Sequence, residues 1–434
     1  MSKIWIATCV TAALLATQGC SRTDSPAQAE VAQGAIRLGQ YRAVLTLPGG
    51  ELPFGFEVAE EDGKYVAYLV NGAERVRVPE VAVSDGHIEA LMPGFENRLS
   101  AQIDGDKLSG HIVLIKRGGK EQVIPFLAEY GVKYRFVDEP EPTSAKLAGR
   151  WAVTFVNEDG EKSPAVGEFR QNGNEATGTF LTPSGDHRFL AGDVQGNEFA
   201  LSAFDGARAA LYRGKITSSG ATLEGTYWSG LALVQNFTAA RDESASLDDA
   251  ASLTTLRSES DGLAFTFPDI QGANVSLQDP RFAGKVVVIT LGGSWCANCH
   301  DEMSFLAPYY IQNRDRGFEV IGLMFEHFDD VGEATAAVTR LRDKFGVQYP
   351  LLIAGTSNKD DVAKKLPQLN GFYAYPTTLF LDRKGRVRRI HTGFSGPSTG
   401  DHYQAFIDEF DATVDQLLAE ADDPVASEQP PTGA

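Results

Sequence analysis

The stretch Gly292-Gly293-Ser294-Trp295-Cys296-Ala297-Asn298-Cys299-His300 decides the fold of the C-terminal part of the chain. It follows the apolar run 286–291, whose β-branched residues predict a buried strand. The two glycines end this strand, and a helix is expected to begin directly after the cysteines. Free amide groups and the positive end of the helix dipole at such a junction stabilise a thiolate. The pattern therefore predicts a protein that exchanges dithiols and disulfides.

The composition is that of a globular protein with two or three domains. The 434 residues are 43% hydrophobic and 10% aromatic, so extensive disorder is not expected. The formal net charge is -19 without a concentrated basic run, which argues against a nucleic-acid partner and against charge-driven binding to anionic lipid. We interpret the charge as an acidic, solvated surface.

Residues 1–20 carry the pattern of a secretory signal peptide. A positive start precedes an apolar stretch over residues 4–16, which is shorter than a membrane span. Gly19-Cys20 resembles the end of a bacterial lipobox, where the cysteine is lipidated, although Thr17 and Gln18 depart from that pattern. We expect lipidation at Cys20, with plain cleavage as the alternative, and a flexible tether over residues 21–36. The protein would then be a lipoprotein on the periplasmic side of the bacterial cell envelope.

Four cysteines are present, and their positions limit the redox chemistry. Cys9 and Cys20 fall in the targeting segment, so the mature chain keeps Cys296 and Cys299. This leaves one CxxC pair and no structural disulfide framework.

The chain is predicted to be multidomain, with an N-terminal antiparallel all-β region of two repeated modules, residues 37–138 and 145–240. Short alternating strands are separated by turn pairs such as Asn71-Gly72. Gly39-Gln40-Tyr41 matches Gly149-Arg150-Trp151, and Leu108-Ser109-Gly110 matches Leu223-Glu224-Gly225. Two sandwiches, two small barrels or one larger β unit would fit this pattern.

After a linker over residues 241–261, residues 262–420 alternate between strands and helices. Strands are expected at 285–291, 318–323 and 377–381, with an antiparallel partner at 385–390, and helices at 334–345 and 403–419. This alternation predicts an α/β domain whose sheet is covered on both faces. The tail 421–434 is Pro-rich and acidic and is expected to be disordered.

Residues 263–418 resemble the TlpA/ResA-like branch of the thioredoxin superfamily. The resemblance rests on motifs in the order that the fold requires: Phe265-x-Phe267-Pro268-Asp269, Trp295-Cys296-Ala297-Asn298-Cys299, Glu302, Tyr375-Pro376-Thr377-Thr378 and Asp382-Arg383-Lys384-Gly385. It implies a thioredoxin-like C-terminal domain that acts as a thiol-disulfide oxidoreductase. The redox-active disulfide Cys296–Cys299 would then need no other cofactor.

The resemblance also implies roles for the cysteines and for Glu302. Cys296 would be the attacking thiolate and Cys299 the resolving thiol, which agrees with the position of Cys296 nearer the helix end. Glu302 would manage the proton of the buried cysteine. Other thioredoxins have a buried aspartate on the central strand, six residues before the first cysteine. This chain has Thr290 at that position, and because a threonine cannot titrate, Glu302 is the better candidate.

Substrate binding is implied for Trp295, Tyr375 and Pro376. Pro376 would be the cis-proline beside the disulfide, and the backbone of Tyr375 would pair with an incoming peptide as an added strand. The chain departs from the family pattern at Gly292-Gly293, which we expect to open space beside Cys296.

Three further interpretations stay open. Cys296 to His300 spells a c-type haem attachment motif, but His300 is expected to be an exposed residue of the first helical turn. A metal site is not expected, since two thiols lack a second pair at zinc spacing. A thiol peroxidase of the peroxiredoxin type would need Pro and Thr at set positions before its cysteine, whereas this chain has Gly292-Gly293-Ser294 there. His327, together with His391 and His402, is expected at surface or loop positions.

The predicted function is reduction of disulfides in cell-envelope proteins, with electrons from a membrane or periplasmic donor. Duty as a disulfide oxidase or isomerase is the alternative. A non-enzymatic possibility is that the β half binds a partner and carries the redox domain as an accessory.

Overall fold

The computed structural model describes residue 1, residues 35–257 and residues 262–420. Residues 2–20 of the predicted signal peptide with the predicted lipidation site Cys20, most of the tether, part of the linker and the tail 421–434 lie outside the described residues. Within the described part of the chain, no helix is both long and apolar enough to cross a membrane.

The first β module is a nine-stranded antiparallel sheet with strand order β4-β3-β2-β1-β9-β8-β7-β6-β5. Its inward side chains form one core that includes Tyr41, Phe54, Phe56 and Phe126. The strands are β1 (Gly39–Leu47), β2 (Gly50–Glu61), β3 (Lys64–Asn71), β4 (Glu74–Val78), β5 (Glu80–Ser84), β6 (His87–Leu91), β7 (Arg98–Asp104), β8 (Lys107–Lys116) and β9 (Lys120–Tyr130).

The second β module also contains nine strands, and its sheet closes on itself. Strand β11 pairs with both β10 and β12, which completes a ring of β10, β11, β12 and β14 to β18. A closed ring leaves no unpaired edge for other chains to bind. The strands are β10 (Gly149–Asn157), β11 (Lys162–Asn172), β12 (Glu175–Thr182), β13 (Gly185–Asp186), β14 (Leu190–Gln195), β15 (Glu198–Phe204), β16 (Ala209–Ile216), β17 (Thr222–Ser229) and β18 (Leu233–Arg241).

The two modules repeat one detail of their first strands. In β1 the hydroxyl of Tyr41 donates to the carbonyl of Arg37, four residues earlier, at 2.9 Å. In β10 the indole nitrogen of Trp151 donates to the carbonyl of Leu147, also four residues earlier, at 2.8 Å. Both rings are buried, so each bond satisfies a polar group inside a core and fixes the chain that enters the strand.

The C-terminal domain is built on a mixed five-stranded sheet of order β24-β23-β22-β26-β27. Strands β22, β23 and β24 are parallel, whereas β26 and β27 are antiparallel to their neighbours. The elements are β22 (Val286–Gly292), α1 (Ala297–Asn313), β23 (Phe318–Glu326), α2 (Val331–Phe345), β24 (Leu351–Thr356), α3 (Lys359–Lys365), β26 (Thr377–Leu381), β27 (Val387–Thr392) and α4 (Asp401–Ala419). Two small two-stranded sheets complete the domain. One pairs β20 (Thr266–Pro268) with β21 (Asn274–Ser276), and the other pairs β19 (Thr255–Leu256) with β25 (Leu369–Asn370).

The sequence analysis missed two elements of this domain, the edge strand β24 and the short helix α3. The helices also divide unequally, because the core on one face takes side chains from α1, α2 and α4. The core on the other face is completed by α3 and by the N-terminal hairpin of β20 and β21. Both faces are covered, as predicted.

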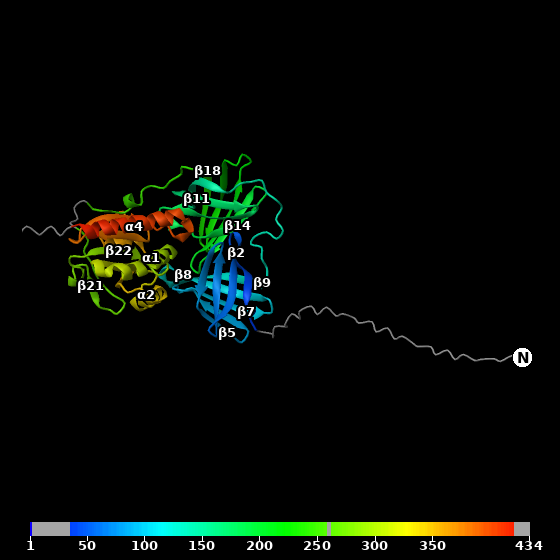
Figure 1. Cartoon of the computed structure of the whole chain (residues 1–434), viewed down its shortest axis with the longest axis horizontal. Coiled ribbons are helices and arrows are strands. Elements are labelled where there is room, and N and C mark those ends of the chain that lie inside the picture. The colour runs from blue at the N-terminus through cyan, green and yellow to red at the C-terminus, as the bar shows by residue number, and fades with distance from the viewer. Residues whose placement is uncertain (2–34, 258–261, 421–434) are drawn as a thin grey trace, which may run out of the picture.

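Both β modules pack against one side of the C-terminal domain (Figure 1). From the first module, Gly118 donates its amide to the carbonyl of His327 at 2.7 Å, and Glu96 forms an ion pair with Arg340. From the second module, the Asp186 carboxylate accepts the amide of Gly396 at 2.7 Å. The three parts of the chain therefore meet where the CxxC motif lies.

Candidate active site

The two cysteines lie at the junction of β22 and α1, as the sequence predicts. Cys296 is the N-cap residue of α1, and its sulfur accepts the backbone amide of Cys299 at 3.2 Å. The two sulfurs are joined in a disulfide. Cys296 is 7% exposed and Cys299 is 3% exposed, so the sulfur nearer the helix end is also the more accessible one. A thiolate at Cys296 would be stabilised by the amides and dipole of the helix N-terminus.

Glu302 is buried one turn further along α1. Its carboxylate accepts hydrogen bonds from the hydroxyls of Thr290 on β22 and Thr378 on β26. Burial raises the pKa of Glu302 to about 7, although both hydroxyls oppose the shift. A carboxyl group with this pKa can take up or release a proton near neutral pH, as the predicted role requires. Thr290 acts here by binding Glu302.

A second buried carboxyl group, Glu326, was not identified from the sequence. It ends β23 and accepts both the amide and the hydroxyl of Ser294, at 2.8 and 2.6 Å. Burial raises the pKa of Glu326 to about 7. The group thus holds the loop that leads into the CxxC motif. Its sequence signal was an acidic residue directly after the apolar run 320–325 of the strand.

The predicted substrate-binding residues lie together around the disulfide. The peptide bond between Tyr375 and Pro376 is cis. Trp295 donates its indole N–H to the carbonyl of Phe325 at 2.9 Å and meets the Tyr375 ring edge-on, with centroids 5.5 Å apart. On its face Trp295 stacks against His327 at 4.4 Å. Burial lowers the pKa of His327 to about 3, with Lys116 and Arg117 adding to the effect. His327 is therefore a neutral wall of this site, half-buried at one of the loop positions that were predicted.

The glycine pair does not open empty space beside Cys296. A Cβ atom on Gly293 would lie 2.3 Å from the indole nitrogen of Trp295 and 2.6 Å from the carbonyl of Phe325. Gly292 lies against Cys299 instead. Gly293 is thus required for the close approach of Trp295 to β23, whereas a Cβ atom on Gly292 would make only an ordinary contact with Cys299.

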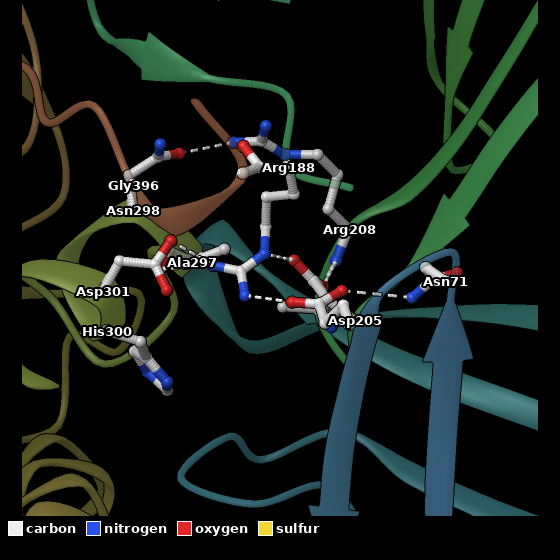
Figure 2. Close-up of polar contacts among 12 residues, drawn as sticks. Asn71, Arg188, Asp205, Arg208, Ala297, Asn298, His300, Asp301 and Gly396 are labelled. Atoms are coloured by element: carbon white, nitrogen blue, oxygen red, sulfur yellow. Dashed lines mark hydrogen bonds and ion pairs between the residues drawn. The ribbon is translucent and has the colours of Figure 1, made fainter. Parts of the chain in front are cut away.

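Asn298, inside the CxxC motif, is bound by the second β module. Its amide nitrogen lies 3.2 Å from the carbonyl of Asp186, to which it donates. Its amide oxygen accepts from the guanidinium of Arg208 at 3.0 Å, and Arg208 also donates to the Asp186 carbonyl (Figure 2). The dipeptide between the cysteines is therefore held by residues more than 80 positions away. No sequence pattern indicated this contact.

His300 is buried, which corrects the prediction of an exposed residue. Its ring stacks on Phe95 of the first module, with centroids 4.0 Å apart and an angle of 5° between the planes. Its Nε2 lies 2.7 Å from the carbonyl of Ser294, and its Nδ1 lies 3.0 Å from the ammonium of Lys344. Burial and Lys344 lower the pKa of His300 well below its usual value. Both ring nitrogens are engaged within the protein, so the motif is not arranged as a haem attachment site.

Comparisons with known proteins bear on the C-terminal part. Residues 261–390 match the family model described as the AhpC/TSA family. The thiol-disulfide oxidoreductase ResA of Geobacillus thermodenitrificans (strain NG80-2) is 30% identical over 129 residues, which are 30% of this chain and 66% of that protein. The ResA of Bacillus subtilis (strain 168) is 26% identical over 134 residues, 31% of this chain and 66% of that protein. The chain thus spans just under two thirds of these relatives' length.

The C-terminal domain is thioredoxin-like. This confirms, for that domain, the resemblance seen in the sequence. Solved structures that match include a thioredoxin-family thiol:disulfide interchange protein from Chlorobium tepidum TLS, with 18% identity, 36% of this chain, 94% of that chain and a TM-score of 0.28. A DsbF homologue from Corynebacterium diphtheriae matches with 20% identity and a TM-score of 0.29, and the match covers 38% of this chain and 97% of that chain.

An ion cluster joins the thioredoxin-like domain to both β modules (Figure 2). The guanidinium of Arg188 pairs with Glu74 of the first module at 2.5 Å, with Asp205 of the second at 3.1 Å, and with Asp301 in the first turn of α1. Burial opposes the charge, but the three carboxylates raise the pKa of Arg188 well above its usual value. Arg188 also adopts a left-handed backbone conformation (φ 61°), which is uncommon outside glycine. One buried cation therefore holds three domains together beside the cysteines.

A cleft of about 420 Å³ opens beside Cys296. Its walls come from the thioredoxin-like domain, from the loop before β7 and the end of β8 of the first module, and from the loop before β13, the loop after β15 and the end of β17 of the second. The β modules therefore form part of the site.

Proposed function

We propose that the protein is a thiol-disulfide oxidoreductase that cycles the Cys296–Cys299 pair between dithiol and disulfide. The observation that carries the proposal is the disulfide at the N-terminus of α1, next to a cis-proline and a buried glutamate whose pKa lies near 7. The relatives that match the thioredoxin-like domain carry the name thiol-disulfide oxidoreductase. The preferred direction is reduction of disulfides in cell-envelope proteins, which is the role that the family resemblance implies.

In the reducing direction the Cys296 thiolate attacks one sulfur of the partner disulfide. The partner's S–S bond breaks, a mixed disulfide forms, and one partner thiolate leaves. Cys299 then attacks the sulfur of Cys296, the internal disulfide forms, and the second partner thiolate leaves. Two electrons pass to the partner. Glu302 takes the proton that Cys299 loses, because its pKa lies close to neutral pH.

The helix N-terminus stabilises the Cys296 thiolate, which makes this sulfur the attacking group in the first step. Tyr375 lines the same cleft as Cys296, and we propose that an extended peptide pairs there with its backbone. A membrane or periplasmic dithiol donor would return the internal disulfide to the dithiol.

The test compares two single substitutions in the full chain. Cys296→Ser removes the attacking sulfur and is expected to abolish disulfide reduction. Cys299→Ser keeps the first step and is expected to accumulate a mixed disulfide between Cys296 and the partner, visible by mass spectrometry and released by dithiothreitol. Turnover that persists in Cys296→Ser would overturn the proposed mechanism.

The direction of electron flow is tested by the reduction potential of the pair, measured by equilibration with glutathione and thiol alkylation. A value near or below that of thioredoxin, about −270 mV, supports a reductase. A value near about −120 mV, typical of a strong oxidant, would make the protein a disulfide donor.

A thiol peroxidase is the competing assignment, because the matching family model is that of the AhpC/TSA family. Ser294 and the glycine pair stand where a peroxiredoxin has its Pro and Thr, and Cys296 is paired with a cysteine in the same helical turn. Consumption of hydrogen peroxide by the reduced protein, at rates above those for peptide disulfides, would favour the peroxidase.

A further inference from the structure

The cleft beside Cys296 has an unusual charge for this chain. It is lined by three cationic side chains, Lys116 from β8, Arg208 from the loop after β15, and Lys359 from the start of α3. The chain as a whole has a net charge of -19. A positive cleft in an acidic protein is a local feature that the overall composition does not explain.

None of these three cations forms an ion pair with a carboxylate in the part of the chain that the structure describes. The guanidinium of Arg208 donates to the amide oxygen of Asn298 and to the Asp186 carbonyl, and the ammonium of Lys359 lies 5.3 Å from the Tyr373 ring centroid. The carboxylate that lines the same cleft, Glu96, is occupied by the guanidinium of Arg340.

The cations also act on one another. Burial lowers the pKa of Lys116, and Arg208 lowers it further against the opposing effect of Asp205. Burial also lowers the pKa of Lys359, with Arg117 adding to the shift. Positive charges that are brought together without anionic partners favour binding of an anion from outside.

The size of the cleft limits what can reach Cys296. Its volume of about 420 Å³ lies at the lower end of the range of roughly 300–1,000 Å³ for small-ligand sites. Cys296 itself is 7% exposed, and the walls from both β modules are tied to the thioredoxin-like domain by the Arg188 cluster. A short extended segment fits this entrance, whereas the surface of a folded domain does not.

We propose that this cleft binds a short, extended cysteine peptide with carboxylate side chains next to its cysteine. The peptide backbone lies along Tyr375, its cysteine sulfur meets Cys296, and its carboxylates pair with Lys116, Arg208 and Lys359. The proposal rests on the proposed function, since it names the substrate class of the same site. In the reducing direction Cys296 attacks the disulfide of the peptide, whose bound half lies in the cleft, and the other half leaves as a thiolate. Cys299 then attacks Cys296, the internal disulfide forms, and the bound half leaves as the second thiolate.

The kinetic test uses the full chain and three symmetric disulfides of capped tripeptides, Glu-Cys-Glu, Gln-Cys-Gln and Lys-Cys-Lys. The ratio of kcat/KM for the acidic to the neutral disulfide is expected to exceed one in the native protein. In the double variant Lys116→Gln/Lys359→Gln this ratio should fall about tenfold, as expected for the loss of two partly exposed charge pairs. The exposed Lys64→Gln variant, at the start of β3, is the matched control and should keep the native ratio. An unchanged ratio in the double variant would overturn the proposal.

A binding test separates this proposal from the redox function. The S-methylated Glu-Cys-Glu peptide cannot exchange, and its binding to the oxidised protein is measured by calorimetry. Binding that weakens in the double variant and with rising salt supports the cleft even if no disulfide is turned over, in which case the proposed function fails alone. Equal binding of the acidic and basic S-methylated peptides would refute the acidic substrate class, whether or not the protein turns over the neutral disulfide.

Discussion

Replacement of Glu302 by Gln is expected to stabilise the protein at alkaline pH. In the unfolded chain this carboxyl group ionises above pH 4.5, whereas in the folded protein it keeps its proton up to about pH 7. Between these values the folded state binds more protons than the unfolded state, so the free energy of unfolding falls as the pH rises. At about 1.4 kcal/mol per pKa unit, the loss amounts to about 3 kcal/mol by pH 8.

Gln is a suitable replacement because it imitates the neutral acid. One of its amide atoms can accept from a threonine hydroxyl and the other can donate to the second hydroxyl, which covers Thr290 and Thr378. The variant therefore keeps the hydrogen bonds of the protonated glutamate and never pays the cost of a buried charge. At pH 5 it should be less than about 1 kcal/mol more stable than the native protein, and at pH 8 about 3 kcal/mol more stable.

The assay is urea unfolding of the oxidised full chain at pH 5 and pH 8. Other groups titrate in this range, so the quantity of interest is the difference between variant and native protein at each pH. The exposed Asp315→Asn variant removes a carboxylate from the same domain and should show no such difference. If Glu302→Gln and the native protein lose the same free energy between pH 5 and pH 8, the glutamate is not held protonated and the argument for its role as proton acceptor fails.

Two further substitutions test the packing of the β modules. Arg188→Met leaves three largely buried carboxylates without their counter-charge and is expected to lower the free energy of unfolding in urea by roughly 3–5 kcal/mol. The control Arg98→Met breaks an exposed ion pair and should lower it by less than about 1 kcal/mol. Equal losses in the two variants would show that the Arg188 cluster does not hold the domains together. Gly110→Ala and Gly225→Ala place a Cβ 2.0 and 2.4 Å from a backbone carbonyl of the neighbouring strand, so each should lower stability by roughly 1–3 kcal/mol; a neutral effect at either site would contradict the tight strand packing.

The sequence predicted those parts of the site that depend on local spacing. The positions of Cys296 and Cys299 follow from a strand, two glycines and a helix start within a dozen residues. Glu302 could be assigned to the buried side of the helix because it lies three residues beyond Cys299. Four of the five strands of the C-terminal sheet were located for the same reason, since runs of apolar residues mark them directly, whereas β24 was missed.

The missing parts depend on contacts between distant segments. His300 was predicted to be exposed because the first turn of a helix usually is, but Phe95 covers it from the first β module. Arg208 reaches Asn298 across 90 positions, and Arg188 reaches Asp301 across 113. A single sequence gives no signal for such pairs, because from the sequence alone each of these polar residues is expected at the surface.

The role of Asn298 connects the β modules to the chemistry. The dipeptide between two redox cysteines tunes their reduction potential over a wide range. Here one residue of that dipeptide donates to Asp186 and accepts from Arg208, both in the second β module. Undocking of that module would leave the amide of Asn298 free and would remove a guanidinium from beside the cysteines. The electrostatic environment that sets the thiolate's stability is therefore completed by a part of the chain outside the thioredoxin-like domain. We therefore expect the reduction potential of the pair to change when the β modules are removed.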